Sequence, residues 1–207
     1  MNLRLAVFAS GRGSNFKAIL AAIQAGTLDA KAVLLISDQP QAGALQTAAQ
    51  AGVPARIITP NAFATNGDYG KALLQALSEC DSNFIVLAGF MRMIPAAVVK
   101  AFSGRIINIH PALLPSFGGK GMFGLRVHQA VLDYGCKVSG ATVHLVDENY
   151  DTGKPLVQRC VPVYEDDTPE SLAARVLKIE HQILPEALQL FAKDRVVIDD
   201  RGVRILT

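Results

Sequence analysis

Several features are missing from this 207-residue sequence, and each absence excludes a class of protein. No low-complexity tract interrupts a composition that is 50% hydrophobic, which excludes a disordered chain. The 20 basic residues nearly balance the 18 acidic ones, and no basic run carries interleaved aromatics, so no nucleic-acid partner is expected. No apolar run approaches the ~20 residues of a membrane helix, and the amino terminus is too short and strand-like for a signal peptide. We therefore expect a soluble protein with no membrane partner.

Cysteine is scarce as well. The three cysteines, Cys80, Cys136 and Cys160, are odd in number and far apart, which fits neither a disulfide framework nor zinc spacing. The histidines are too scattered to predict a metal site, and no serine lies in a nucleophile-elbow pattern. Reduced thiols, a cytoplasmic location and no metal are the expectation.

In the first half of the chain, short apolar runs alternate with amphipathic segments. The pattern predicts strands at residues 3–8, 32–36, 55–58, 84–88 and 105–109, and helices at 16–24, 42–51, 69–77 and 95–102. Such alternation is typical of a parallel, helix-covered sheet. We therefore predict a single α/β domain with a doubly wound, mostly parallel, Rossmann-like sheet.

The second half differs in character. Residues 116–124 are rich in glycine and predict a mobile loop or lid. A helix is expected at 127–134, with His128 at the surface or in the lid, and strands at 139–146 and 156–163. A long helix begins near Thr168, and Pro185 is expected to kink or interrupt it. Residues 195–206 predict a small hairpin that turns at 200–202.

The most site-like stretch is the end of the predicted strand at 105–109, where Asn108 and His110 precede two prolines. Residues two apart on a strand point to the same face, so the amide and the imidazole project together. In open α/β sheets, ligands bind outside the carboxyl ends of the strands. The plainer alternative is a strand-end histidine and a turn-forming asparagine with no chemistry.

A glycine loop at residues 11–15 lies between the first strand and the first helix. Free backbone N–H groups and the helix dipole there favour a phosphate. The alternative is an ordinary turn with Ser14 or Asn15 as the N-cap. A dinucleotide site with Asp38 as ribose ligand is disfavoured, because Phe16 occupies the position of the third glycine in that fingerprint.

Two further segments carry candidate groups. Residues 87–94 present apolar side chains beside Arg92, where a flat ligand can lie, although Met91, Met93 and Ile94 can equally be core residues. Asp151 follows the strand of His144 in a glycine-bounded loop, where a carboxylate can orient a histidine or pass a proton. Acidic side chains in turns are, however, more commonly exposed to solvent without a functional role.

Taken together, the sequence resembles the phosphoribosylglycinamide formyltransferase family, the folate-dependent enzymes of purine synthesis. The matching stretches occur in family order and cover nearly the whole chain; they are residues 10–15, 87–92, 108–116, 140–144, 151–153 and 180–181. The loop after Phe117 is longer than in the common pattern, and residues 60–70 lack an arginine that some relatives use near the folate tail.

The resemblance implies transfer of a formyl group from 10-formyltetrahydrofolate, as co-substrate, to the amine of 5-phosphoribosylglycinamide. It implies a phosphate-binding half at about 1–100 and a catalytic, folate-binding half at about 101–207. The implied catalytic residues are Asn108, His110 and Asp151. The implied phosphate ligands are Gly11, Arg12, Gly13, Ser14 and Asn15, with Glu180 at the substrate amine or ribose. The implied folate contacts are Met91, Arg92, Met93, Ile94, Asn108, Val143, His144 and Asp151.

The chemistry of these residue types agrees with that reaction. An amine that attacks a formamide-like carbonyl gives a tetrahedral oxyanion, and Asn108 with a protonated His110 can donate hydrogen bonds to it, each worth ~3 kcal/mol. Asp151 is expected to keep His110 charged and to help move the proton. Only small-molecule partners are implied, and the protein is expected to be a monomer or homodimer.

Alternative functions remain at this point. Formyltetrahydrofolate hydrolase and methionyl-tRNA formyltransferase share the formyl-folate chemistry, but each carries an added domain for which 207 residues leave no room. A dinucleotide-binding module without chemistry is the rival from another class, and Phe16 argues against it.

Overall fold

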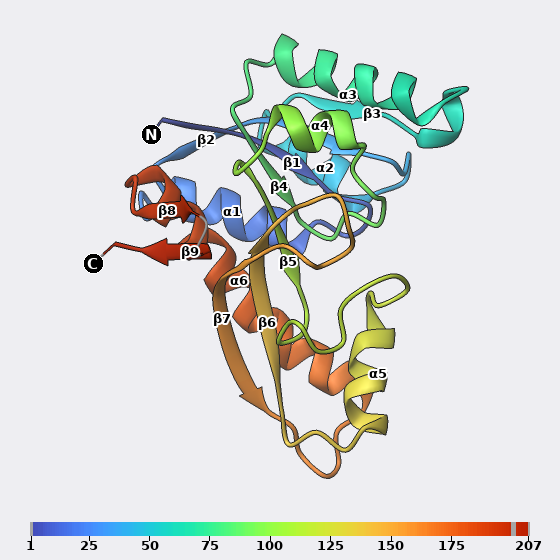
Figure 1. Ribbon diagram of the computed structural model, residues 1–207, viewed down its shortest axis with the longest axis vertical. Helices are drawn as coiled ribbons and strands as arrows, with labels where there is room; N and C mark the ends of the chain where they lie inside the picture. Colours follow the sequence, from blue (N-terminus) through green and yellow to red (C-terminus); the bar gives the residue numbers. More distant parts are fainter. Residues whose placement is uncertain (1, 200–201, 207) are drawn as a thin grey trace.

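The computed structural model describes residues 2–199 and 202–206. Seven strands form the main sheet in the order β3-β2-β1-β4-β5-β6-β7 (Figure 1). The strands are β1 (Leu3–Phe8), β2 (Ala30–Ser37), β3 (Ala55–Ile57), β4 (Phe84–Leu87), β5 (Ile106–His110), β6 (Val138–Leu145) and β7 (Pro155–Pro162). The helices are α1 (Ser14–Gln24), α2 (Gly43–Gln50), α3 (Asn66–Glu79), α4 (Ala96–Ala101), α5 (Leu125–Asp133) and α6 (Pro169–Ala192), with a short 3-10 helix η1 (Pro60–Ala62). The predicted α/β fold is confirmed.

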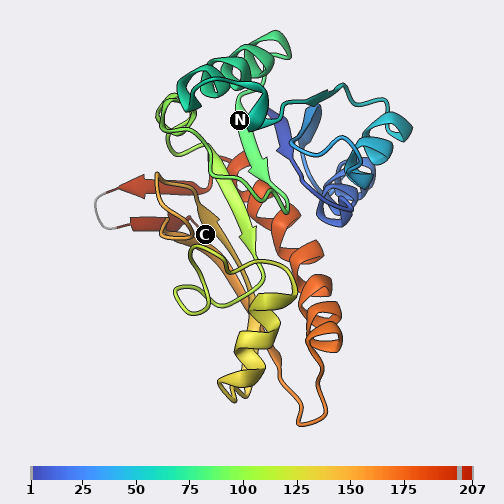
Figure 2. The ribbon, with the colours of Figure 1, turned by 90° about the vertical axis from the view of Figure 1, so that its right-hand side faces the viewer.

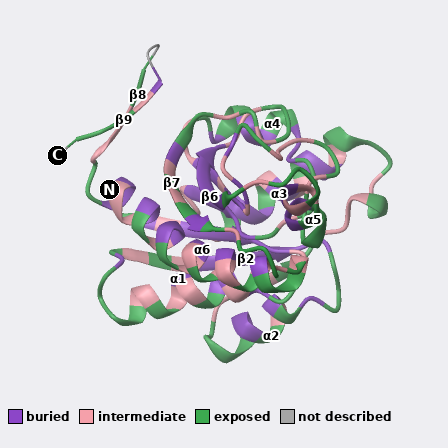
Figure 3. Ribbon diagram, turned by 90° about the horizontal axis from the view of Figure 1, so that it is seen from below, coloured by how far each residue is buried: buried purple, intermediate pink, exposed green. Residues whose placement is uncertain are grey.

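The sheet is buried on both faces, as a continuous apolar run such as β1 requires. Leu5 and Val7 belong to one core cluster, and Ala6 and Phe8 belong to the other. The first cluster includes residues of α1, α2, α5 and α6, whereas the second includes residues of α3 and α4. Figure 3 shows the buried residues concentrated in strands and on the inner sides of helices. Helices therefore cover both faces of the sheet.

The topology brings several loops to one edge. β3, β2, β1, β4 and β5 are parallel, while β6 and β7 run antiparallel to their neighbours. From β1 the chain moves outward to β2 and β3, then returns to the other side of β1 as β4. This reversal of strand order lies between β1 and β4, where α/β sheets commonly bind ligands. The segments that follow β1, β4 and β5 meet beside it.

The carboxyl-terminal part contains one correction. α6 continues through Pro185 from Pro169 to Ala192, so the expected interruption is wrong. Thr168 caps the helix by accepting a hydrogen bond from the Ser171 N–H, and α6 packs on α1, α5, β6 and β7. That packing stabilises the helix although proline removes one backbone donor.

The expected terminal hairpin is present as β8 (Val196–Asp199) paired antiparallel with β9 (Gly202–Ile205). Its turn was predicted at residues 200–202, of which 200 and 201 lie outside the described residues. Figure 2 shows this hairpin projecting from the body of the molecule. In the described part of the chain, no helix is long and apolar enough to cross a membrane.

Candidate functional site

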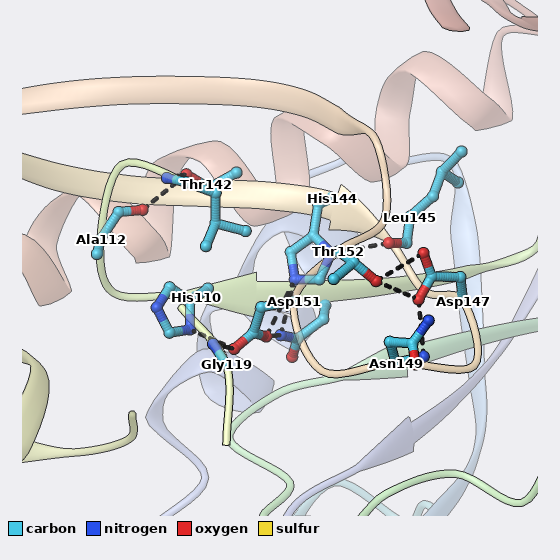
Figure 4. A network of polar contacts seen from close by, with 12 residues as sticks. His110, Ala112, Gly119, Thr142, His144, Leu145, Asp147, Asn149, Asp151 and Thr152 are labelled. Atoms are coloured by element: carbon cyan, nitrogen blue, oxygen red, sulfur yellow. Dashed lines mark hydrogen bonds and ion pairs between the residues drawn. The ribbon is translucent and has the colours of Figure 1, made fainter. Parts of the chain in front are cut away.

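Asn108, His110 and Asp151 lie together at the end of β5. The His110 Nδ1 lies 3.6 Å from Asp151 Oδ2, and the Asn108 amide nitrogen lies 3.4 Å from Asp151 Oδ1. Figure 4 shows Asp151 between His110 and His144. The side chain of His110 is 4% exposed and that of Asp151 is 13% exposed, so water screens their charges weakly.

The loop between β6 and β7 carries Asp151 to this position. A Cβ at Gly153 would lie 1.7 Å from the Leu145 carbonyl oxygen, so only glycine lets the loop pass so close to the end of β6. Within the loop, Asp147 accepts hydrogen bonds from the Asn149 N–H and the Thr152 hydroxyl. Asp151 itself has a φ of 55°, a left-handed conformation that aspartate tolerates better than most residues. These local features turn the carboxylate back over β5.

His144 fixes the orientation of the Asn108 amide. The His144 Nδ1 lies 2.7 Å from the Leu145 carbonyl, which can only accept, so Nδ1 carries the proton and Nε2 is an acceptor in the neutral ring. The Asn108 amide donates to this Nε2 at 3.0 Å and, more weakly, to Asp151 at 3.4 Å. The second, longer bond is the one that a ligand oxygen can replace at least cost.

His110 is held by the loop that follows it. Its Nε2 lies 2.9 Å from the Phe117 carbonyl, so Nε2 carries a proton and Nδ1 faces Asp151. Burial lowers the pKa of His110 below its usual value, although Asp151 and the Phe117 carbonyl act in the opposite direction. In the ligand-free protein burial favours the neutral ring, and the protonated His110 expected during the reaction stays a prediction.

Asp151 remains ionised despite its position. Burial acts to raise its pKa, but the neighbouring His144 and His110 rings and the hydrogen bond from the Gly119 N–H together lower the pKa below the usual value. The Gly119 N–H donates to Asp151 Oδ2 at 2.9 Å. Residues 117–119 of the expected lid thus contact both His110 and Asp151. A Cβ at Gly118 would meet Leu114 Cδ2 at 2.6 Å, so any side chain there would require Leu114 to move.

The glycine loop has the features of an anion site. α1 begins at Ser14 with no side-chain cap on its first N–H groups, after Gly13 in a left-handed conformation with a φ of 77°. A Cβ at Gly13 would lie 2.8 Å from Ala44 Cα, so this residue must be glycine. Gly11 and Arg12 are exposed beside it. The loop therefore offers free backbone donors at the positive end of a helix of 11 residues.

Asn15 and Glu180 meet beside that loop although they are far apart in the sequence. The Asn15 amide donates to Glu180 Oε2 at 2.7 Å, and Asn15 Oδ1 is buried without a hydrogen-bond partner in the described structure. Burial raises the pKa of Glu180, which the hydrogen bond from Asn15 only partly offsets. The packing of α6 on α1 brings this pair together.

The segment after β4 divides into exposed and buried residues. Met91 and Met93 are each 48% exposed, so the core interpretation is wrong for them, whereas Ile94 is buried. The Arg92 Nε donates to Asp38 Oδ2 at 2.9 Å. Asp38 is buried and its Oδ2 is occupied by Arg92 and Gln39, while its Oδ1 is buried without a hydrogen-bond partner among the described residues, so the carboxylate is not exposed to a ribose hydroxyl.

Tertiary packing buries two residues that the sequence placed near the site. The side chain of Val143 is fully buried in the core, and its backbone pairs with Ile109 and Val157 in the sheet, so its contact with folate stays a prediction. His128 is buried on the inner side of α5, so the expectation of a surface or lid position is wrong. That error arises because a local pattern does not reveal which face a neighbouring element covers.

Sequence reasoning also missed supporting residues. The Thr142 hydroxyl donates to the Ala112 carbonyl at 2.6 Å and accepts from the Leu114 N–H at 3.0 Å, which fixes the segment after His110. The Gln158 amide donates to Thr142 and to the Leu114 carbonyl. The only sequence signal was that Thr142 shares a strand face with His144. Among residues 2–199 and 202–206, no three His, Cys, Asp or Glu side chains group as metal ligands.

Comparison with known proteins gives consistent matches along the chain. The sequence model of the family described as formyl transferase matches residues 3–188. The phosphoribosylglycinamide formyltransferase of Bacillus subtilis (strain 168) is 38% identical over 199 residues, which are 96% of this chain and 97% of the relative. The chloroplastic phosphoribosylglycinamide formyltransferase of Vigna unguiculata is 41% identical over 98% of this chain, which spans 65% of that relative. The crystal structure of glycinamide ribonucleotide transformylase 1 from Symbiobacterium toebii has a TM-score of 0.94 and 40% identity, covering 100% of this chain and 95% of the other.

Proposed function

The chain belongs to the phosphoribosylglycinamide formyltransferase family, and we propose that it transfers the formyl group of 10-formyltetrahydrofolate to the amine of 5-phosphoribosylglycinamide in purine biosynthesis. The observation that carries the proposal is the close grouping of Asn108, His110 and Asp151 in a weakly hydrated site. Formyl transfer passes through an oxyanion and a proton transfer, and this set supplies amide, imidazole and carboxylate groups for both.

Asn108 and His110 stabilise the oxyanion in this proposal. The long 3.4 Å contact from the Asn108 amide to Asp151 is exchanged for the developing oxyanion, while His144 continues to hold the amide in orientation. Once it gains a proton, His110 stabilises the oxyanion through its positive charge, because its two N–H groups face Phe117 and Asp151. That proton gives His110 a positive charge that pairs with Asp151. The site therefore favours the charged histidine only when the reaction supplies the proton.

The proton comes from the attacking amine. In the free protein the His110 Nδ1 has a lone pair that faces a carboxylate oxygen at 3.6 Å, which is an unfavourable pairing until a proton enters between them. We propose that this proton reaches His110 as the C–N bond forms and then passes to the departing folate nitrogen. Asp151 stabilises the imidazolium in the interval.

The substrates bind on either side of this centre. We propose that the phosphate of the ribonucleotide binds residues 11–15, and that Glu180, held by Asn15, contacts the amine or ribose. The folate ring lies against the half-exposed Met91 and Met93, with Arg92, Ile94, Asn108, His144 and the loop of Asp151 around it. The first 100 residues thus form mainly the phosphate-binding half, and the remainder forms the catalytic and folate-binding half.

The decisive experiment mixes the protein with 10-formyltetrahydrofolate and follows deformylated folate with and without glycinamide ribonucleotide. Acceptor-dependent release with formation of the formylated ribonucleotide is expected. Acceptor-independent release would identify a formyltetrahydrofolate hydrolase, and no release would exclude both activities.

We further propose that the protein acts on small molecules alone, as a monomer or homodimer. The cysteines Cys80, Cys136 and Cys160 are free, a state that a reducing compartment such as the cytoplasm maintains. Sedimentation at several protein concentrations distinguishes the two oligomeric states.

A further inference from the structure

Asp38 is a buried carboxylate at the edge of the sheet where β2 ends. It is 1% exposed, and its Oδ2 accepts hydrogen bonds from Arg92 Nε at 2.9 Å and from the Gln39 amide at 3.0 Å. Burial acts to raise its pKa, but the Ser10 hydroxyl, Arg92 and Gln39 together lower the pKa below the usual value. A buried charge of this kind is costly and is kept only where its partners compensate for it.

Ser10 connects this carboxylate to the segment after β4. Its hydroxyl accepts the Met91 N–H at 2.9 Å, and the same hydroxyl is one of the groups that lower the pKa of Asp38. The Ser10 N–H also donates to the Gly89 carbonyl at 3.0 Å. The ends of β1, β2 and β4 are therefore joined through Ser10 and Asp38, immediately before the glycine loop.

The side chain of Arg92 is 46% exposed although its Nε is tied to Asp38. A guanidinium bonded through Nε has its two terminal nitrogens on the opposite side, where they can donate in parallel to one planar acceptor. Within the described residues, no hydrogen bond from those terminal nitrogens is recorded. Asp38 therefore holds the Nε of Arg92. The tip of the side chain, which consists of the two terminal nitrogens, is available on the surface that carries Met91 and Met93.

We propose that Asp38 is a positioning residue for folate: it orients Arg92, together with Ser10 it sets the backbone of residues 89–92, and it thereby presents the Arg92 tip to a carboxylate or carbonyl group of the folate. The proposal rests on the proposed function, because it names a determinant of the same folate site. Asp38 does not touch the ligand, so it acts on folate affinity through Arg92 and not on the chemical step.

Kinetics of the Asp38→Asn variant test the proposal. Asparagine is nearly isosteric and can still accept from Ser10, but it cannot form the ion pair. The KM for 10-formyltetrahydrofolate should rise about tenfold, with kcat and the KM for the ribonucleotide within about threefold of wild type. A large fall in kcat with an unchanged folate KM would overturn the proposal.

A double-mutant cycle with Arg92→Ala separates positioning from a general structural role. If Asp38 acts through Arg92, Asp38→Asn should leave the folate KM of the Arg92→Ala protein unchanged within about twofold. If Asp38→Asn raised the folate KM of the Arg92→Ala protein as much as it raises that of wild type, the inference would be refuted. Asp81→Asn is the matched control, since Asp81 is an exposed carboxylate paired with Arg4 at 3.2 Å and far from this edge.

Two further measurements keep the test decisive. If Asp38→Asn does not fold, Ser10→Ala replaces it: the folate KM should rise about threefold, and an unchanged value would contradict the inference.

If the wild-type protein transfers no formyl group, the proposed function fails on its own. Calorimetric titration of tetrahydrofolate into wild type and Asp38→Asn then still measures the effect of Asp38 on folate affinity. Equal affinities of the two proteins would overturn the inference.

Discussion

His110 and His128 are both buried, but different neighbours surround them. His110 donates to the Phe117 carbonyl and faces Asp151, whereas the Nδ1 of His128 has no hydrogen-bond partner in the described structure. Burial, and then the charge of His110, lower the pKa of His128 to about 4. The first histidine is prepared to accept a proton, and the second is kept neutral.

Replacing His110 should affect the chemical step. We expect His110→Ala to lower kcat by about 10² to 10⁴, the usual contribution of a general acid or base, because the proton acceptor beside Asp151 is lost. The folate affinity should change little, as measured by calorimetry on the same preparation. A kcat near that of wild type would show that His110 is not a catalytic residue.

His128 should make folding stability sensitive to pH. Its folded pKa of about 4 lies below the usual 6.5, so between these values the unfolded chain binds a proton that the folded protein does not. The contribution is fully present above pH 6.5 and is lost as pH falls toward 4, by up to about 3 kcal/mol. Urea unfolding of wild type and His128→Gln at about pH 7.5 and about pH 4.5 measures it. Equal losses in both proteins would show that His128 does not titrate in this way.

Among the helices, α1 is the one at whose start we propose that an anion binds. Its first N–H groups have no side-chain cap, and Gly13 allows the close approach of the backbone to Ala44. The substrate lacking its phosphate should therefore have a KM raised at least about tenfold. Steady-state assays with the ribonucleotide and its dephosphorylated form make the comparison. Equal KM values would place the phosphate elsewhere.

The loop between β6 and β7 depends on one glycine. In Gly153→Ala, the new Cβ would lie 1.7 Å from the Leu145 carbonyl oxygen, so the loop must move and carry Asp151 with it. We expect a loss of at least ~3 kcal/mol of stability and loss of activity. Gly52→Ala is the matched control, because its φ is 66° but nothing lies within 4 Å of its Cβ, so only about 1 kcal/mol should be lost. Similar losses in both variants would mean that crowding at Gly153 is unimportant.

At the scale of the whole molecule, both halves share one core. The cluster on the α1 and α6 face contains Leu5 and Phe16 from the first half together with Val143 and Leu184 from the second. β4 and β5 also pair directly across the boundary of the halves. We therefore expect the halves to unfold together.

Chemical denaturation can check this directly. Of the four tyrosines, Tyr69 reports on the first half, and Tyr134, Tyr150 and Tyr164 lie in the second. Far-UV circular dichroism and tyrosine fluorescence should give coincident single transitions. Separate transitions would show that residues 1–100 and 101–207 are independent folding units.

Most of the local structure, and the groups available for chemistry, could be predicted from the amino-acid sequence. The strands and helices follow from continuous apolar runs and amphipathic spacing, and Gly26, Gly52 and Gly135 follow the ends of their helices in left-handed conformations. Asn108 and His110 share a strand face for the same local reason, since alternate residues of a strand point the same way.

How distant groups act on one another depends on the folded arrangement of the chain. It brought Asp151 to His110, paired Asp38 with Arg92, and buried His128 and Val143. It also set the surroundings of His110, where burial lowers the pKa and Asp151 acts in the opposite direction. Burial and electrostatic coupling depend on which elements cover a residue, and no local pattern contains that information.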